Sequence, residues 1–237
     1  TDTTWFVSLR ERHNGQDRRR PSDSLQFGLA VHRVRVAGVT ASGDVDNVEL
    51  TLIDSSLVSR TRFLAMVRDR VQALPPPLDF AVVYVHGYGT GLHEGWTHAA
   101  TARRRSRSNV PWVVISWPSN GAGIDWPSLG ALVERAYLDD SANARASIPS
   151  FDRALRAVHE AVGGPRTVLV THSMGVQLAG EALASRPALR QLLGADPLRA
   201  VAFVSPDMEA RRFADYIVPA TTPLAPRVAF YANARDR

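Results

Sequence analysis

One serine lies where a short apolar run gives way to a helical pattern. The run covers 167–171, the helical pattern covers 174–186, and Ser173 sits in the turn between them. A strand, a tight turn and a helix in this order lift a serine hydroxyl out of a sheet edge, where it can act as a nucleophile. The next backbone N–H then points back at the atom that the hydroxyl attacks. Ser173 is therefore the first nucleophile candidate.

The match to the G-x-S-x-G pattern of such turns is incomplete. Thr171 occupies the first glycine position, and only Gly175 is kept. A serine that merely caps a helix at a strand–helix junction is the alternative interpretation. The apolar strand before Ser173 and the helical spacing after it favour the nucleophile.

A glycine-rich turn supplies candidate donors for an oxyanion. The apolar run 80–85 is followed by His86-Gly87-Tyr88-Gly89-Thr90. We expect the backbone amide of Tyr88, together with that of Met174, to form an oxyanion hole. The alternative is a glycine turn that simply ends a buried strand.

Two acids follow later apolar runs and could orient a catalytic base. Asp236 follows the run 227–231, and Asp207 follows the run 199–204. We favour Asp236, because Asp207 is well placed to cap a helix that begins near Glu209. Asp207 stays the alternative acid.

The seven histidines do not include a good base for this arrangement. All lie at or before His172, so none follows either acid. We expect His172 to pack beside the serine with its side chain turned away, and His86 to belong to the glycine-rich turn. His93 and His98 are expected to lie exposed at the start of a helix.

Strands and helices alternate through most of the chain, which predicts an α/β fold with a parallel sheet covered on both faces. The expected strands are 80–85, 112–117, 167–171, 199–204 and 227–231, and the expected helices are 94–105, 149–162, 174–186 and 208–216.

The amino-terminal part has a different pattern. The runs 26–36 and 47–53 are expected to form an antiparallel edge of the sheet, followed by a helix over 60–74, and 14–23 is expected to be a polar loop. We divide one domain, 1–237, into an amino-terminal part (1–78) and a core (79–237). Within the core, 118–148 is expected to be a lid or pocket wall with a short helical stretch over 129–138.

Composition narrows the classes of function. The chain has 237 residues, 45% of them hydrophobic, and no cysteine, which excludes a disulfide framework and a thiol nucleophile. All 28 basic residues are arginine, scattered except at 18–20 and 103–105, so we expect a solvated face and no nucleic-acid partner. With neither a bilayer-length apolar stretch nor a hydrophobic leader, we expect a soluble chain whose compartment and oligomeric state stay open.

Several segments in order resemble one family, the bacterial α/β hydrolases of unknown function that are related to esterases and lipases. The resemblance is carried by Phe6 to Arg10, Leu25 to Gly28, Tyr84-Val85-His86-Gly87-Tyr88, Ser116-Trp117-Pro118-Ser119-Asn120-Gly121, His172-Ser173-Met174-Gly175, Ser205-Pro206-Asp207 and Tyr231 to Arg237. It covers nearly the whole chain.

The resemblance implies an α/β-hydrolase fold without a cofactor or metal, and a triad of serine, acid and histidine whose acid matches Asp236. In the family the histidine lies downstream of the acid, beyond Arg237, so we expect a further carboxyl-terminal piece with the last strand, helix and histidine. A substitute histidine such as His93, or an inactive relative, is the alternative.

Together these features predict a serine hydrolase that cleaves small carboxylic esters through an acyl-enzyme on Ser173. Trp117, Trp126 and His86 are expected at the substrate pocket, although buried aromatic residues are often plain core. The competing hypothesis is a non-catalytic domain that binds a ligand or partner. Thioester and amide substrates need the same machinery, and the sequence does not separate them from esters.

Overall fold

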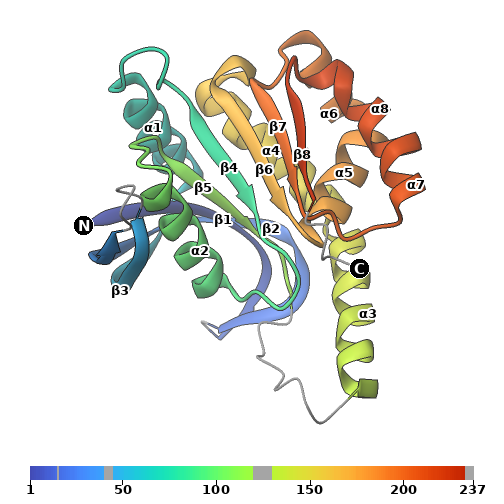
Figure 1. Cartoon of the computed structure of the whole chain (residues 1–237), viewed down its shortest axis with the longest axis horizontal. Helices are drawn as coiled ribbons and strands as arrows, with labels where there is room; N and C mark the ends of the chain where they lie inside the picture. Colours follow the sequence, from blue (N-terminus) through green and yellow to red (C-terminus); the bar gives the residue numbers. More distant parts are fainter. Residues whose placement is uncertain (15, 40–44, 120–129, 233–237) are drawn as a thin grey trace.

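The computed structural model describes residues 1–14, 16–39, 45–119 and 130–232, built around an eight-stranded sheet (Figure 1). The strand order is β3-β2-β1-β5-β4-β6-β7-β8. The strands are β1 (Asp2–His13), β2 (Gln16–Val39), β3 (Val45–Val58), β4 (Ala81–Val85), β5 (Trp112–Ser116), β6 (Thr167–His172), β7 (Ala200–Val204) and β8 (Val228–Tyr231). In this spatial order, each strand from β1 through β5, β4, β6 and β7 to β8 is parallel to its neighbour. Strand β2 is antiparallel to both β1 and β3. The predicted α/β class with an antiparallel amino-terminal edge is confirmed.

Helices cover both faces of the sheet. They are α1 (Arg60–Gln72), α2 (Leu92–Arg105), α3 (Gly130–Ala146), α4 (Ile148–Val162), α5 (Gly175–Ser185), α6 (Pro187–Ala195), α7 (Ala210–Arg212) and α8 (Val218–Thr221), the last two joined by a π-helical turn over Phe213–Ile217. Side chains alternate between the faces: Val83 and Val85 join the larger core with α1, α4 and α5, and Val82 joins the smaller core with Trp96 of α2. Such two-sided burial explains the nearly continuous apolar runs of the parallel strands.

The amino-terminal strands differ from expectation: β1 was not predicted, and β2 and β3 extend well beyond the expected runs 26–36 and 47–53. The expected polar loop 14–23 is largely strand, because β2 begins at Gln16 and pairs with β1 from there. Arg18, Arg19 and Arg20 are exposed on it. Two strands can pair through backbone hydrogen bonds without an apolar face. The polar composition of residues 14–23 therefore gave no sign that this segment is a strand.

Two helices also differ from expectation. Helix α3 runs to Ala146, well past the short stretch near 129–138, and α6 was not predicted. Helix α6 begins at Pro187, one residue after the C-cap of α5, so its pattern merges with that of the preceding helix. Within the described ranges, no helix has both the length and the apolar composition that crossing a bilayer requires.

The carboxyl ends of the parallel strands meet at one edge of the sheet. Val85, near the end of β4, pairs with Thr171 of β6, and His172 of β6 pairs with Val204 of β7. The segments after these strands therefore lie side by side, at the position where open α/β sheets bind their ligands.

Candidate functional site

Ser173 occupies a strained turn between β6 and α5. Its φ angle is +52°, in the left-handed region that residues other than glycine rarely adopt. Its amide donates a hydrogen bond to the carbonyl of Val204 at 2.9 Å, which ties the turn to β7. The side chain is half-buried. The expected strand, tight turn and helix are present, with Ser173 in the turn.

Two glycines allow this turn to lie against the turn that follows β4. A Cβ on Gly175 would lie 2.5 Å from the carbonyl oxygen of His86 and 2.9 Å from that of Val85. A Cβ on Gly87 would lie 2.9 Å from the Cβ of Ser173. The backbones touch directly, which explains why Gly175 is kept. Thr171, by contrast, is a buried strand residue of β6.

Substituting Gly175 should therefore be costly. We expect Gly175→Ala to lower the free energy of unfolding by about 1–3 kcal/mol, because the obstructing atoms belong to the backbone and cannot rotate away. The matched control is Gly194→Ala in α6, where no atom lies within 4 Å of the added Cβ. That change should be neutral or stabilising by up to about 1 kcal/mol. Urea denaturation of both variants measures the difference, and equal effects would contradict the contact.

A buried arginine supports the turn after β4. Arg10 of β1 is 5% exposed, and its Nε donates to the hydroxyl of Ser116 at 3.3 Å. Its Nη1 donates to the carbonyl of Ser119 at 3.1 Å, and its Nη2 to the carbonyl of Thr90 at 3.0 Å. One side chain thus connects the first strand with the ends of two loops. The sequence motifs contained Arg10, but its spacing from the turn gave no signal of this role.

Helix α3 holds the same turn from another side. The hydroxyl of Ser119 donates to Oδ2 of Asp140 at 2.6 Å and accepts from the amide of Thr90 at 3.2 Å. The amide of Gly89 donates to the same Asp140 oxygen at 3.4 Å. Two amides of the turn are therefore committed to protein acceptors.

The amides expected to form the oxyanion hole differ from those two. Among the hydrogen bonds of the described residues, the backbone amides of Tyr88 and Met174 donate none. They belong to the two turns that touch at Gly87 and Ser173. Neither amide is thus committed to an acceptor among the described residues, and their role in an oxyanion hole stays a prediction.

Trp117 and His86 were expected at the substrate pocket, but both are completely buried. The Trp117 indole donates to the carbonyl of His86 at 2.8 Å, and the two rings stack with centroids 5.4 Å apart. Neither side chain has surface to offer a ligand. Their contacts make them supports of the turn instead. Trp126, the other expected pocket residue, lies outside the described residues.

His86 is held in its neutral form. Burial, reinforced by the nearby positive charge of Arg10, lowers the pKa of His86 to about 3. Its Nδ1 lies 3.0 Å from the carbonyl oxygen of Gly87 and therefore carries the proton. Its Nε2, 3.2 Å from the hydroxyl of Ser116, then accepts. Because His86 is completely buried and both of its ring nitrogens have partners within the protein, it orients the turn and is not available as a base.

This buried histidine should make the fold sensitive to acid. The unfolded chain protonates His86 near its ordinary pKa of 6.5, whereas the folded chain does not until about pH 3. The stability that neutral His86 contributes is complete above pH 6.5 and is lost on acidification at about 1.4 kcal/mol per pH unit. Between pH 7 and pH 5 we expect a loss of about 2 kcal/mol from this group, measured by urea denaturation.

A variant and its control isolate that contribution. His86→Gln should be less stable at both pH values but should lose less stability between them. His13→Asn, at an exposed histidine near the end of β1, should behave like the parent protein. The same pH dependence in His86→Gln and in the parent would assign the acid sensitivity to other groups.

A cavity of about 660 Å³ opens beside Ser173. It is lined by residues from three segments, Tyr137, His172, Ser173, Ser205, Pro206 and Asp207, together with Met208 and Glu209. The structure thus brings the candidate nucleophile and the alternative acid to one cavity. The favoured acid, Asp236, lies outside the described residues.

Two expectations about this cavity were wrong. His172 is exposed and lines the cavity instead of packing beside the serine. Asp207 does not cap the following helix, since the N-cap of α7 is Glu209. The apolar runs predicted that both residues lie close to the ends of strands. They did not predict the direction of the side chains, which depends on the local backbone at those ends.

Tyr137 of α3 holds Asp207 in place. Its hydroxyl lies 2.9 and 3.0 Å from the two carboxylate oxygens of Asp207, and burial together with this carboxylate raises the pKa of Tyr137. Its ring also contacts that of Tyr88, with centroids 5.7 Å apart. Gln177 of α5 donates to the backbone carbonyl of Asp207 at 2.7 Å. One aromatic residue that sequence reasoning did not single out therefore bridges the acid and the glycine-rich turn.

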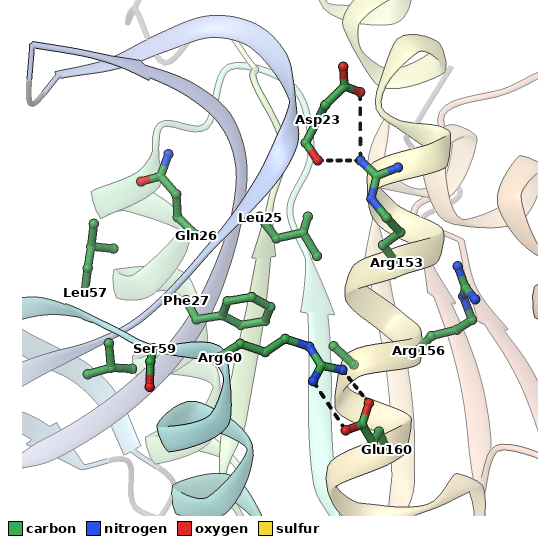
Figure 2. Close-up of a pocket in the computed structure, with 12 residues that line it drawn as sticks. Asp23, Leu25, Gln26, Phe27, Leu57, Ser59, Arg60, Arg153, Arg156 and Glu160 are labelled. Atoms are coloured by element: carbon green, nitrogen blue, oxygen red, sulfur yellow. Dashed lines mark hydrogen bonds and ion pairs between the residues drawn. The ribbon is translucent and has the colours of Figure 1, made fainter.

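A second large cavity, of about 750 Å³, lies apart from these residues between β2, β3, α1 and α4 (Figure 2). Its three arginines are paired: Arg60 with Glu160, Arg153 with the carbonyl of Asp23 at 2.9 Å, and Arg156 with Asp152 at 2.7 Å. It shares no lining residue with the cavity of Ser173. The serine in its lining, Ser59, caps α1, because its hydroxyl accepts from the amide of Arg62 at 3.3 Å. We therefore place the functional site at Ser173.

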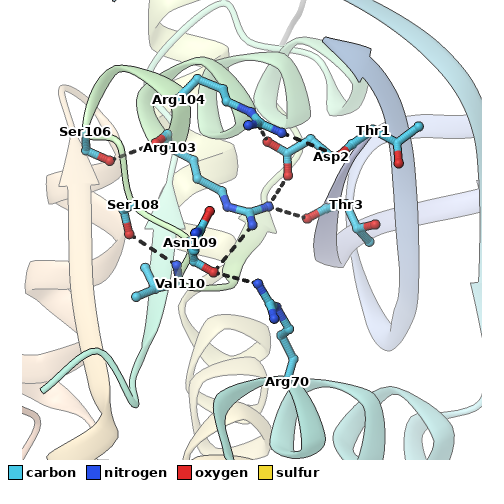
Figure 3. A network of polar contacts seen from close by, with 10 residues as sticks. All are labelled: Thr1, Asp2, Thr3, Arg70, Arg103, Arg104, Ser106, Ser108, Asn109 and Val110. Atoms are coloured by element: carbon cyan, nitrogen blue, oxygen red, sulfur yellow. Dashed lines mark hydrogen bonds and ion pairs between the residues drawn. The ribbon is translucent and has the colours of Figure 1, made fainter. Parts of the chain in front are cut away.

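The arginine cluster 103–105 has a structural role (Figure 3). Arg103 and Arg104 of α2 both bind the buried carboxylate of Asp2 in β1, and Arg103 also donates to the carbonyl of Asn109 at 3.4 Å. These two guanidinium groups thus join the first strand to α2.

The described part of the chain contains no group of three or more His, Asp or Glu side chains placed to hold a metal ion.

Comparison with known proteins identifies relatives at the level of family and fold. A family model described as "Alpha/beta hydrolase of unknown function (DUF900)" matches residues 74–237. Among solved structures, the chain is similar to "Crystal structure of esterase PE8", with 18% sequence identity and a TM-score of 0.38 over 66% of this chain and 86% of that chain. No curated protein matches. The family match includes both turns and both candidate acids.

Proposed function

Because this chain belongs to that family of α/β hydrolases of unknown function, we propose that it is a serine hydrolase that cleaves carboxylic esters. The observation that carries the proposal is the φ angle of +52° at Ser173, in a turn between strand and helix that opens into a cavity. Strain of this kind persists only where the surrounding structure enforces it, and it is common at catalytic residues. A serine that only capped a helix would need no such conformation.

The reaction proceeds through an acyl-enzyme. The Oγ of Ser173 attacks the ester carbonyl, the alcohol leaves, and water then releases the acid and restores the hydroxyl. The amides of Tyr88 and Met174 donate to the oxyanion of each tetrahedral intermediate. Loss of one such donor typically raises the activation barrier by about 2.7–4 kcal/mol. We infer that the hydrogen bonds of Arg10, Ser119 and Asp140 serve to fix the position of the turn after β4, which carries the Tyr88 amide.

The proton of Ser173 goes to a histidine that a carboxylate orients. We assign the carboxylate to Asp236, with Asp207 as the alternative that the cavity supports. The family resemblance sets the histidine after the acid, whereas the seven histidines of this sequence all precede both acids. We therefore assign the base to none of them.

Labelling with a small fluorophosphonate tests the proposal, with intact mass and peptide mapping as the readout. We expect a single adduct on the parent protein and none on Ser173→Ala. The matched control is Ser205→Ala, because Ser205 lines the same cavity and also has a positive φ, of +45°. An adduct that persists in Ser173→Ala would overturn the assignment. A folded parent protein that takes no adduct would favour the non-catalytic binding domain.

A further inference from the structure

An apolar cavity of about 530 Å³ adjoins the cavity of Ser173. The two share Ser205, Pro206 and Met208 in their walls, so the apolar cavity lies next to the one that Ser173 lines. None of the described residues that line the apolar cavity carries an ionisable side chain. Its lining consists mainly of Met208, Phe213, Ala214, Val218 and Phe230.

The aromatic wall of this cavity is ordered by ring contacts. The ring of Phe213 packs edge-on against Phe203 of the core, with ring centroids 5.3 Å apart, and against Phe230, with centroids 6.2 Å apart. Phe230 nevertheless keeps 64% of its surface exposed. Exposed aromatic surface beside a nucleophile is an unfavourable arrangement in water that an apolar ligand would relieve.

Another cavity adjoins the site, and its lining combines apolar side chains, such as Leu138 and Ile148, with charged ones. It shares Tyr137, Met208 and Glu209 with the cavity of Ser173 and has a volume of about 790 Å³. Charged side chains line it, among them Arg145 and the ion pair of Arg212 with Glu181, whose Nε and Oε1 are 2.8 Å apart. The cavity of Ser173 thus adjoins both an apolar cavity and one that holds charged side chains.

We propose that the apolar cavity binds the acyl chain of the ester and that the charged cavity receives a polar leaving alcohol. The substrate class is then an ester that joins an unbranched or lightly branched aliphatic acid to a polar alcohol. This inference rests on the proposed function, since it takes Ser173 as the acylated residue. It adds the chemical nature of each half of the substrate.

A series of p-nitrophenyl esters, from acetate to octanoate, tests the acyl cavity. We expect kcat/KM to rise about fourfold for each added methylene until the cavity is filled, since each buried methylene contributes about 0.8 kcal/mol. In Ala214→Phe the new ring occupies the cavity, and kcat/KM should stay at the level of the acetate ester throughout the series.

Two further variants keep this test interpretable. Ala210→Phe fills the same cavity from another exposed position, in case Ala214→Phe does not fold. Ala188→Phe is the matched control, because Ala188 is exposed on α6 and does not line the cavity. It should keep the rise of the parent protein.

The outcomes separate this inference from the proposed function. If the fluorophosphonate labels Ser173 but both cavity variants keep the rise of the parent protein, the cavity does not bind the acyl chain. If acetate esters of longer alkyl alcohols show the rise instead, the two cavities have the reverse roles and the assignment is wrong. Absence of labelling at Ser173 would remove the proposed function itself.

Discussion

Alanine in place of Ser173 should lower kcat for ester hydrolysis by about 10⁴- to 10⁶-fold while the protein stays folded. The hydroxyl oxygen is the atom that becomes acylated in the proposed mechanism, so no neighbouring group can replace it. The measurement is steady-state hydrolysis of a p-nitrophenyl ester, with far-UV circular dichroism to verify the fold.

Glycine at the same position separates catalysis from folding. Ser173→Gly should lose the same activity but gain about 1 kcal/mol in the free energy of unfolding, because glycine adopts φ of +52° without strain. A variant of Ser173 that keeps more than a tenth of the parent kcat would refute the nucleophile. A destabilised Ser173→Gly would refute the strain.

Asparagine in place of Asp236 should lower kcat by about 10⁴-fold, because the amide no longer holds the histidine in the required tautomer. Asp207→Asn should have a much smaller effect, of about tenfold or less. The reason for the difference is that both carboxylate oxygens of Asp207 already accept from Tyr137, which gives this carboxylate a structural task. Steady-state kinetics on Asp236→Asn and Asp207→Asn measures this difference in kcat.

Tyr137→Phe is the control, because it removes the hydroxyl that binds the Asp207 carboxylate and leaves the carboxylate in place. If Asp207 only anchors α3, Tyr137→Phe and Asp207→Asn should lower kcat to a similar, small extent. If Asp207→Asn instead loses about 10⁴-fold while Tyr137→Phe stays close to the parent, Asp207 is the triad acid and our preference for Asp236 is wrong.

The parallel core was predictable from local patterns. Short β-branched runs that alternate with helical spacing favour a parallel sheet covered on both faces, whereas the register of β4, β6 and β7 is seen only in the structure. The polar ribbon of β1 and β2 was not predictable in the same way. Its residues 14–23 have no apolar face, and only their pairing with β1, the strand directly before them, makes them extended.

The supports of the site were equally invisible in the sequence. Arg10 lies 106 positions from Ser116, and Tyr137 lies 70 positions from Asp207, yet each pair is joined by a hydrogen bond. No local spacing relates such residues, because the fold alone sets the distance between them. Trp117 and His86 show the converse: their types suggested a ligand surface, and burial made them supports.

The sequence by itself determined the α/β class, the strand–turn–helix at Ser173 and the glycine-rich turn after β4. These features depend on short-range propensity, on apolar periodicity and on glycine where backbones must touch, all of which can be read from neighbouring residues. The tertiary structure alone decided that Asp207 faces the cavity of Ser173, that Arg10 and Asp140 hold the turn, and that an apolar cavity and one with charged side chains adjoin that cavity. Those relations come from the packing of distant elements, which no local pattern encodes.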